Sequence, residues 1–196
     1  IPHREGIYVL DVELYAGHMV RLERANALPA IVIRDFGTGE EHAIAFDEAA
    51  YSLDTMGGYE FDTTNLRFSY SSMTTPAEVY DYDMAKRTRV LRKRQEIPSG
   101  HDPADYVTTR IMARSFDGAE VPVSILHRKD FVRDGRAPLL LYGYGSYGHA
   151  MPASFNANRL SLVDRGFVYA IAHIRGGSDK GWGWYLDGKR EKKTNT

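Results

Sequence analysis

An apolar run that leads directly into a glycine-rich turn is the feature that most constrains this chain. Residues 138–148 read Pro-Leu-Leu-Leu-Tyr-Gly-Tyr-Gly-Ser-Tyr-Gly. Three leucines and a tyrosine in succession predict a strand that is buried on both faces. Open α/β sheets bind their ligands outside the carboxyl ends of such strands. The segment therefore predicts a functional turn at the end of a strand in an α/β domain.

The three glycines of this turn also match the Gly-x-Gly-x-x-Gly pattern of a dinucleotide-binding motif. That motif should open a helix directly, but Pro152 and its neighbours follow instead. The next apolar run, 167–174, ends at Arg175 and not at an acid that could bind a ribose. We therefore favour a turn that exposes Tyr144, and keep an NADP-dependent oxidoreductase as an alternative.

The first half of the chain, residues 7–97, has an all-β pattern. The run 18–24 alternates apolar and charged residues, which predicts a half-exposed strand. Strands and turns recur from 18 to 46 and from 66 to 97, a loose repeat of about 45–50 residues that fits one four-stranded propeller blade. The run from Lys86 to Arg94 holds six basic residues. They alternate with apolar ones, so we interpret the run as a solvated strand face and not as a nucleic-acid patch.

The β pattern breaks at 98–103, where two prolines and a glycine indicate a linker. We place a domain boundary there, with one domain at 1–100 and a second at 101–196. In the second domain, Asp117-Gly118 predicts a hairpin.

A βαβ unit follows the hairpin in the prediction. Its parts are the strand at 138–142, a helix near 156–165 ended by Gly166, and a strand at 167–174. We expect the basic, amphipathic end of the chain, 182–196, to be helical.

No serine satisfies the Gly-x-Ser-x-Gly pattern of a nucleophile elbow. Ser146 lacks the leading glycine and Ser178 lacks the trailing one, so both are interpreted as turn residues. We expect His101 to be a linker residue in solvent, and His173 to pack or hydrogen-bond within its apolar strand. No histidine cluster has metal-ligand spacing, and we expect neither a metal nor a cofactor.

The overall composition limits which classes of binding partner and which chemistry we expect. The 196 residues have a formal net charge of −1, which predicts no attraction to nucleic acid or to an anionic membrane. The chain has no cysteine, which excludes disulfides and a thiol nucleophile. That absence fits the cytoplasm and leaves the periplasm open. The chain starts at Ile1 without an initiator methionine, so we expect a truncated start.

Long contiguous stretches of this sequence resemble the prolyl oligopeptidase family of serine peptidases, in particular its trypsin-like branch, oligopeptidase B. The stretches that carry the resemblance are 66–76, 121–124, 141–148, 159–170, 174–177 and 187–196. The resemblance is strong over about 60–196 and more diffuse before that.

The resemblance implies a seven-bladed β-propeller that caps an α/β-hydrolase domain. Residues 1–100 would then be the last blades, and residues 101–196 the start of the catalytic domain. Tyr144 matches the family's tyrosine whose hydroxyl donates to the oxyanion, and Tyr147 matches an aromatic residue of the substrate pocket. The implied substrates are short peptides, cleaved after arginine or lysine.

Two departures from the family follow. The positions that match its serine, aspartate and histidine lie beyond Thr196, so we expect these 196 residues alone to be inactive. Some relatives carry an acidic pair where Pro152 and Ser154 stand here, which predicts a weaker preference for paired basic residues. A β-propeller-type binding module without catalysis is kept as a further alternative.

Overall fold

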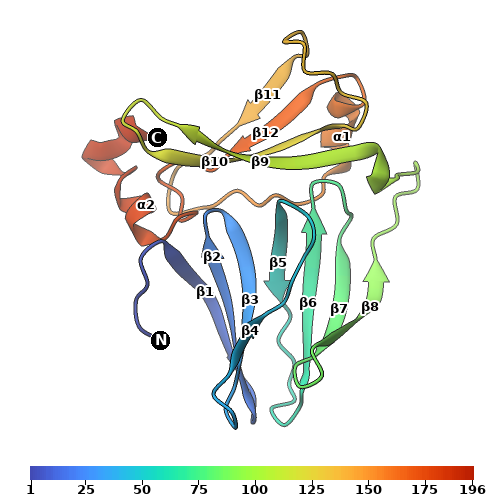
Figure 1. The fold of residues 1–196 in the computed structure, drawn as a ribbon, viewed down its shortest axis with the longest axis vertical. Coiled ribbons are helices and arrows are strands. Elements are labelled where there is room, and N and C mark those ends of the chain that lie inside the picture. The colour runs from blue at the N-terminus through green and yellow to red at the C-terminus, as the bar shows by residue number, and fades with distance from the viewer.

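The computed structural model describes residues 1–196 and contains three four-stranded sheets (Figure 1). The first sheet contains β1 (Ile7–Leu14), β2 (His18–Ala25), β3 (Leu28–Asp35) and β4 (Glu41–Ala43). The second contains β5 (Tyr51–Thr55), β6 (Asn65–Ser72), β7 (Glu78–Asp83) and β8 (Thr88–Arg94). The third contains β9 (Tyr106–Arg114), β10 (Glu120–Arg128), β11 (Leu139–Tyr142) and β12 (Val168–Ala172). The helical elements are η1 (Pro103–Asp105), α1 (Ala157–Val163), α2 (Trp182–Leu186) and η2 (Arg190–Asn195).

The first two sheets are antiparallel meanders in which the strands lie in sequence order. This confirms the predicted repeat of strands and turns, but β5 lies between its two predicted copies and was missed. The two sheets pack face to face around one apolar cluster, in which Ile31 and Ile33 of the first sheet and Leu66 and Phe68 of the second are fully buried. Alternating apolar residues place one face of each sheet in this core.

One expectation for the first sheet was wrong. The charged residues of β2 do not face water, because Arg21 and Glu23 are buried. The Nε of Arg21 donates to Glu23 at 2.7 Å, and its two terminal nitrogens donate to Glu41 at 2.8 Å. Alternation therefore located the strand correctly, but ion pairing allows its polar face to be buried too. By contrast, every residue of β8 is exposed, as expected for the basic run.

The third sheet has the order β11-β12-β10-β9. The β9–β10 hairpin turns at Asp117-Gly118, as expected, and Gly118 has a left-handed φ of 86°. Strands β11 and β12 are parallel and α1 connects them, which confirms the βαβ unit. Gly166, with φ 88°, ends α1 in a Schellman pattern of bonds from Phe167 N to Leu162 O and from Gly166 N to Val163 O.

Strand β11 is not buried, contrary to expectation. It lies at the edge of the sheet, with β12 as its single neighbour. All four of its residues are exposed, and Leu141 is 60% exposed. The apolar run correctly predicted a strand, but burial depends on what packs against both faces, which a local pattern does not specify.

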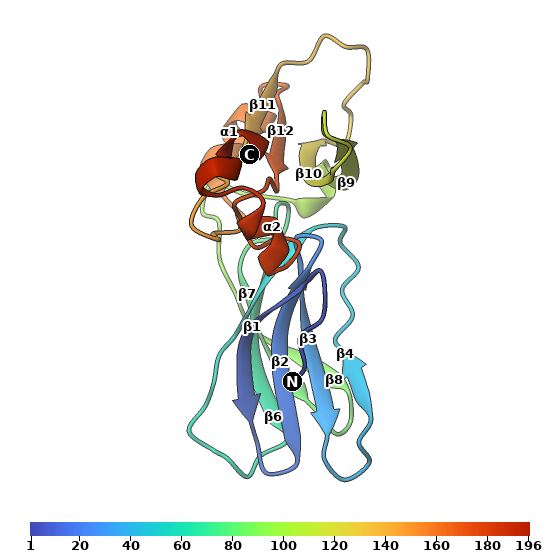
Figure 2. The ribbon, with the colours of Figure 1, turned by 90° about the vertical axis from the view of Figure 1, so that its left-hand side faces the viewer.

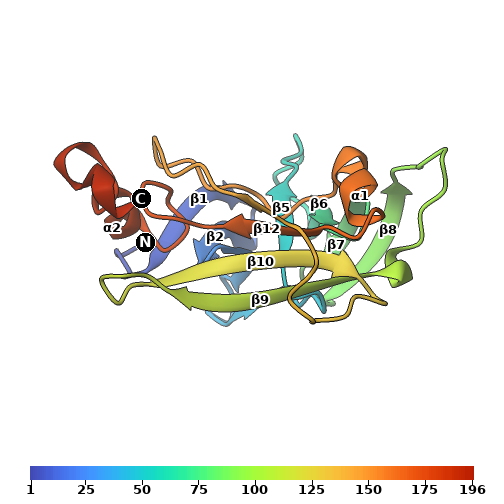
Figure 3. The same cartoon turned by 90° about the horizontal axis from the view of Figure 1, so that it is seen from above.

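The third sheet lies across the ends of the first two (Figures 1 and 2). Seen from above, β9 and β10 run over both sheets (Figure 3). A second apolar cluster joins these layers, because Ala50 and Met73 from the second sheet's loops pack with Leu126 and Ile171 of the third sheet. The predicted domain boundary at residue 100 falls in the connection between β8 and β9.

His101, in that connection, is not a free linker residue. Its Nε2 lies 2.6 Å from the carbonyl oxygen of Thr74, and its ring packs against Tyr106 and Phe155. The prediction of a solvated histidine was wrong because its ring makes these contacts, although residues 98–100 and 102–105 around it are exposed.

The chain end forms two short helical pieces, α2 and η2, instead of the single helix expected over 182–196. The break lies at Lys189, whose backbone is extended (φ −119°, ψ 157°). Beside it, a Cβ on Gly188 would lie 2.2 Å from the backbone nitrogen of Gly176. Such close backbone packing is possible only for glycine. None of the helical elements combines the length and the apolar composition that a membrane-spanning helix needs.

Candidate active site

Tyr144 and Tyr147 lie in the turn that follows β11, residues 143–148, which we call the tyrosine turn. Tyr144 stands at the carboxyl end of the strand, is 45% exposed, and packs edge-on against His149 at 5.7 Å between ring centroids. Tyr147 is 88% exposed and has a left-handed φ of 58°. The turn therefore presents two phenol side chains to solvent from one strand end.

The tyrosine turn rests on a second loop, residues 175–181, which we call the glycine loop. Gly148 forms an isolated parallel bridge with Gly177, and its N–H donates to Gly176 O at 2.9 Å. The hydroxyl of Ser178 donates to Gly148 O at 2.8 Å. The tyrosine turn and the glycine loop are far apart in sequence. In the fold their backbones bond to each other, and the glycine loop holds the tyrosine turn in place.

The fit between these loops leaves no space for side chains. A Cβ on Gly145 would lie 2.8 Å from the carbonyl oxygen of Arg175. Gly145 and Gly176 also have left-handed φ values of 66° and 90°. Glycine is required at both positions for conformation and for close approach.

The geometry argues against the dinucleotide alternative. Helix α1 begins only at Ala157, and Asn156 caps it by accepting from the N–H groups of Asn158 and Arg159. The N–H of Gly148 is already bonded to the glycine loop. No helix N-terminus therefore opens at the glycine turn to receive a pyrophosphate.

The serines and His173 have structural partners. The Oγ of Ser146 accepts from the Nζ of Lys193 at 2.8 Å, and Ser178 bonds to Gly148, so both are turn residues as expected. His173 is buried and hydrogen-bonded to Ser124 and Asp179, which confirms that it hydrogen-bonds within the core. Sequence reasoning missed Ser124 and Asp179, and no local motif marks either of them.

A cavity of about 450 Å³ lies beside the tyrosine turn. It is bounded by β1 and β5 of the first two sheets and by residues 149–152, which follow the turn directly. Asp11, Asp54 and Arg24 contribute charged groups to its lining. Burial raises the pKa of the Asp54 carboxyl, and the charge of Arg24 partly offsets this rise. Burial lowers the pKa of Arg24, and the charge of Asp54 partly offsets this fall. The volume suits a small ligand or a few peptide residues.

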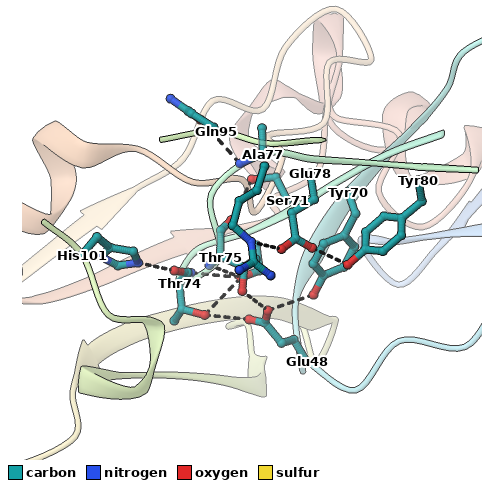
Figure 4. Close-up of polar contacts among 12 residues, drawn as sticks. Glu48, Tyr70, Ser71, Thr74, Thr75, Ala77, Glu78, Tyr80, Gln95 and His101 are labelled. Carbon is teal, nitrogen blue, oxygen red and sulfur yellow. Dashed lines mark hydrogen bonds and ion pairs between the residues drawn. The ribbon is translucent and has the colours of Figure 1, made fainter. Parts of the chain in front are cut away.

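A larger cavity, about 620 Å³, lies elsewhere, against the second sheet and between residues 46–48 and the connection that follows β8. Two of its carboxylates, Glu48 and Glu78, are hydrogen-bonded by the protein itself (Figure 4). Glu48 accepts from the hydroxyls of Tyr70, Thr74 and Thr75 at 2.9, 2.8 and 2.6 Å.

Glu78 of the same cavity accepts from Tyr80 and from the Nε of Arg94, both at 2.6 Å (Figure 4). Burial, with a contribution from Glu78, raises the pKa of Tyr80 to about 12. These contacts brace the strand ends, so the cavity beside the tyrosine turn is the better candidate for a site.

Two family profiles match the chain. The profile described as "Prolyl oligopeptidase, N-terminal beta-propeller domain" matches residues 1–95, and "Prolyl oligopeptidase family" matches residues 153–196. The first two sheets are thus propeller sheets, and the third begins the α/β-hydrolase region.

Characterised relatives agree with these profiles. Dipeptidyl aminopeptidase BI of Pseudoxanthomonas mexicana is 45% identical over all of this chain and 27% of its own length. Protease 2 of Moraxella lacunata is 29% identical over 28% of its length. The structure of oligopeptidase B from Trypanosoma brucei with covalently bound antipain superposes with a TM-score of 0.91 and 34% identity, over all of this chain and 29% of that one. The chain thus spans less than a third of the length of these relatives.

Proposed function

The chain belongs to the prolyl oligopeptidase family, and on that premise we propose that it is part of a serine oligopeptidase that hydrolyses short peptides. The observation that carries the proposal is the position of Tyr144, at a strand end and on a turn that backbone contacts hold from below. We assign to its hydroxyl the donation of a hydrogen bond to the oxyanion of the tetrahedral intermediate. A donor held in place stabilises that charge without reorganisation during the reaction.

The order of elements supports this role. In chain order, β11 is the third strand of the third sheet, and α1 is the first α-helix to follow it. In α/β-hydrolases, the loop between the third strand and the first helix supplies an oxyanion-hole donor. The tyrosine turn occupies that loop.

We assign Tyr147 to the substrate pocket. Its left-handed backbone is uncommon for an aromatic residue and persists only where the surroundings impose it. The bonds from Gly148 and Ser178 impose it here, and they leave the ring 88% exposed, available to a ligand.

Cleavage after arginine or lysine is the specificity we propose first, from the likeness to oligopeptidase B. Dipeptidyl aminopeptidase activity is a second candidate, because identity to the enzyme of that name is 45%, against 29% to Protease 2. Blocking the substrate N-terminus separates the two. An oligopeptidase B-like enzyme cleaves N-acylated arginyl peptides, whereas a dipeptidyl aminopeptidase requires the free amine two residues before the cleaved bond.

The test of the oxyanion assignment is the Tyr144→Phe variant of the complete enzyme. Removal of one oxyanion donor lowers kcat by about 100- to 1000-fold. We expect that loss with little change in KM, because the bond forms to charge that develops only in the transition state. An unchanged kcat would remove Tyr144 from the reaction. We also propose that residues 1–196 alone show no peptidase activity, and turnover by this segment would contradict that.

A further inference from the structure

A hydrogen-bonded chain of serine, histidine and aspartate runs from the third sheet into the glycine loop. The Oγ of Ser124 is 2.9 Å from the Nε2 of His173, and the Nδ1 of His173 is 3.1 Å from the Oδ1 of Asp179. A carboxylate can only accept, so Nδ1 donates to Asp179, and a neutral imidazole then accepts the Ser124 hydroxyl proton at Nε2. The order of groups is that of a serine-hydrolase triad.

This chain of residues cannot be a catalytic triad. Ser124, His173 and Asp179 are 1%, 2% and 2% exposed, so no substrate reaches the hydroxyl. Ser124 also lies in the middle of β10, paired with Arg110 on one side and Ile171 on the other. A nucleophile elbow instead places its serine on a sharp turn between a strand and a helix.

The three residues connect the sheet interior to the glycine loop. Ser124 belongs to β10, His173 directly follows β12, and Asp179 lies in the glycine loop itself. The Asp179 carboxylate packs onto the loop backbone so closely that a Cβ on Gly177 would lie 2.3 Å from its Oδ2. The Trp184 Nε1–H group adds a 3.0 Å bond to the carbonyl oxygen of His173.

The glycine loop in turn carries the tyrosine turn. Gly177 bridges Gly148, Gly176 accepts from its N–H, and Ser178, the neighbour of Asp179, donates to its carbonyl oxygen. The backbone oxygen of Asp179 also accepts from Ala27 N, in the turn between β2 and β3, at 2.7 Å. A displacement of Asp179 is therefore transmitted to the turn through several bonds.

We infer that Ser124, His173 and Asp179 are positioning residues, which set the location of the Tyr144 hydroxyl by fixing the glycine loop to the sheet interior. This inference rests on the proposed function of Tyr144. None of the three touches substrate. Their contribution is made through another residue, so it must disappear when the Tyr144 hydroxyl is absent.

A double-mutant cycle in the complete enzyme tests this dependence. Asp179→Ala is expected to lower kcat by about 10- to 100-fold, since small misplacement of a catalytic group costs up to about 100-fold, with KM changed less than about threefold. In a Tyr144→Phe background, the same substitution is expected to change kcat by less than about threefold. If the kcat of the double variant instead fell by the product of the two single-variant factors, the inference would be overturned. No loss from Tyr144→Phe alone would instead overturn the proposed function.

Two further variants keep the test decisive if Asp179→Ala folds poorly. His173→Asn can still donate to Asp179 from the Nδ1 position, whereas His173→Gln retains a polar group only at the Nε2 position. We expect near wild-type kcat for the first and a loss like that of Asp179→Ala for the second. Equal kcat values for the two variants would contradict the inference, and so would labelling of Ser124 by a fluorophosphonate probe.

Discussion

The carbonyl oxygen of Gly145 occupies the space that a side chain on Gly176 would need: a Cβ there would lie only 2.0 Å from it. This contact joins the tyrosine turn to the glycine loop and excludes every residue except glycine at position 176. The position of Tyr144 thus depends on a residue far from it in sequence.

Gly176→Ala is expected to lower both the Tm and kcat of the complete enzyme. Gly39→Ala is the matched control, because Gly39 also has a left-handed φ, 74°, but has no atom within 4 Å of the added Cβ. Both variants carry a conformational cost of about 1–2 kcal/mol. Only Gly176→Ala adds a clash. Thermal unfolding should therefore show a larger fall in Tm for Gly176→Ala than for Gly39→Ala, and only Gly176→Ala should lower kcat. Equal effects of the two variants would refute the contact.

Tyr147→Gly separates conformation from binding. Glycine adopts the observed φ of 58° without strain, so the Tm should not fall, and the exposed ring gives up little burial. Loss of a substrate contact should raise KM by about tenfold, which corresponds to about 1.4 kcal/mol. Peptide hydrolysis and thermal unfolding measure the two effects. An unchanged KM would take Tyr147 out of the substrate pocket.

Asp81 predicts a pH-dependent contribution to stability. Hydrogen bonds from Arg67 and Arg92 lower the pKa of its carboxyl to about 2. Because the folded-state pKa lies below the unfolded one, the contribution is complete above about pH 5 and is lost as pH falls towards 2. Both arginines are largely exposed, so we expect only about 1–2 kcal/mol.

Asp81→Asn should therefore destabilise the protein at pH 7 and lose about half of that effect at pH 3. Denaturant unfolding at the two pH values measures the difference. A difference between variant and wild type that does not change with pH would show that the carboxylate is not preferentially charged in the folded state.

Specificity for paired basic residues should respond to Pro152 and Ser154. Pro152 lines the cavity beside the tyrosine turn, so an aspartate there would add negative charge next to a bound peptide. We expect the Pro152→Asp, Ser154→Asp double variant to raise kcat/KM for an Arg-Arg peptide about tenfold relative to one with a single arginine. The same kcat/KM ratio before and after substitution would disprove this explanation.

Much of this fold was predictable because its signals are local. Local patterns predicted the strands within 18–46 and 66–97 but missed β5, and glycines at 118 and 166 predicted a hairpin and a helix end that the structure confirms. The triple leucine correctly predicted β11, but its exposure depends on a position at the sheet edge. The buried Arg21 depends likewise on Glu41, a residue of another strand.

The candidate site was predictable only in part, for the same reason. An exposed Tyr144 at a strand end could be predicted because strand, glycine and tyrosine are consecutive in the chain, whereas its assignment to the oxyanion came from the family resemblance. The residues that support Tyr144 could not be identified from the sequence. Ser124, His173 and Asp179 come from three segments that only the folded chain brings together. Short-range patterns contain no signal for such a contact.

The affinity of a peptide aldehyde inhibitor measures the central claim most directly. An aldehyde forms a tetrahedral adduct with a nucleophilic serine, and the adduct oxygen occupies the oxyanion position. In the complete enzyme, Tyr144→Phe should weaken inhibition by about 100-fold, the lower range for loss of one donor, while KM for the matching peptide substrate changes less than about threefold. Equal inhibition of wild type and variant would show that the Tyr144 hydroxyl does not bind the oxyanion.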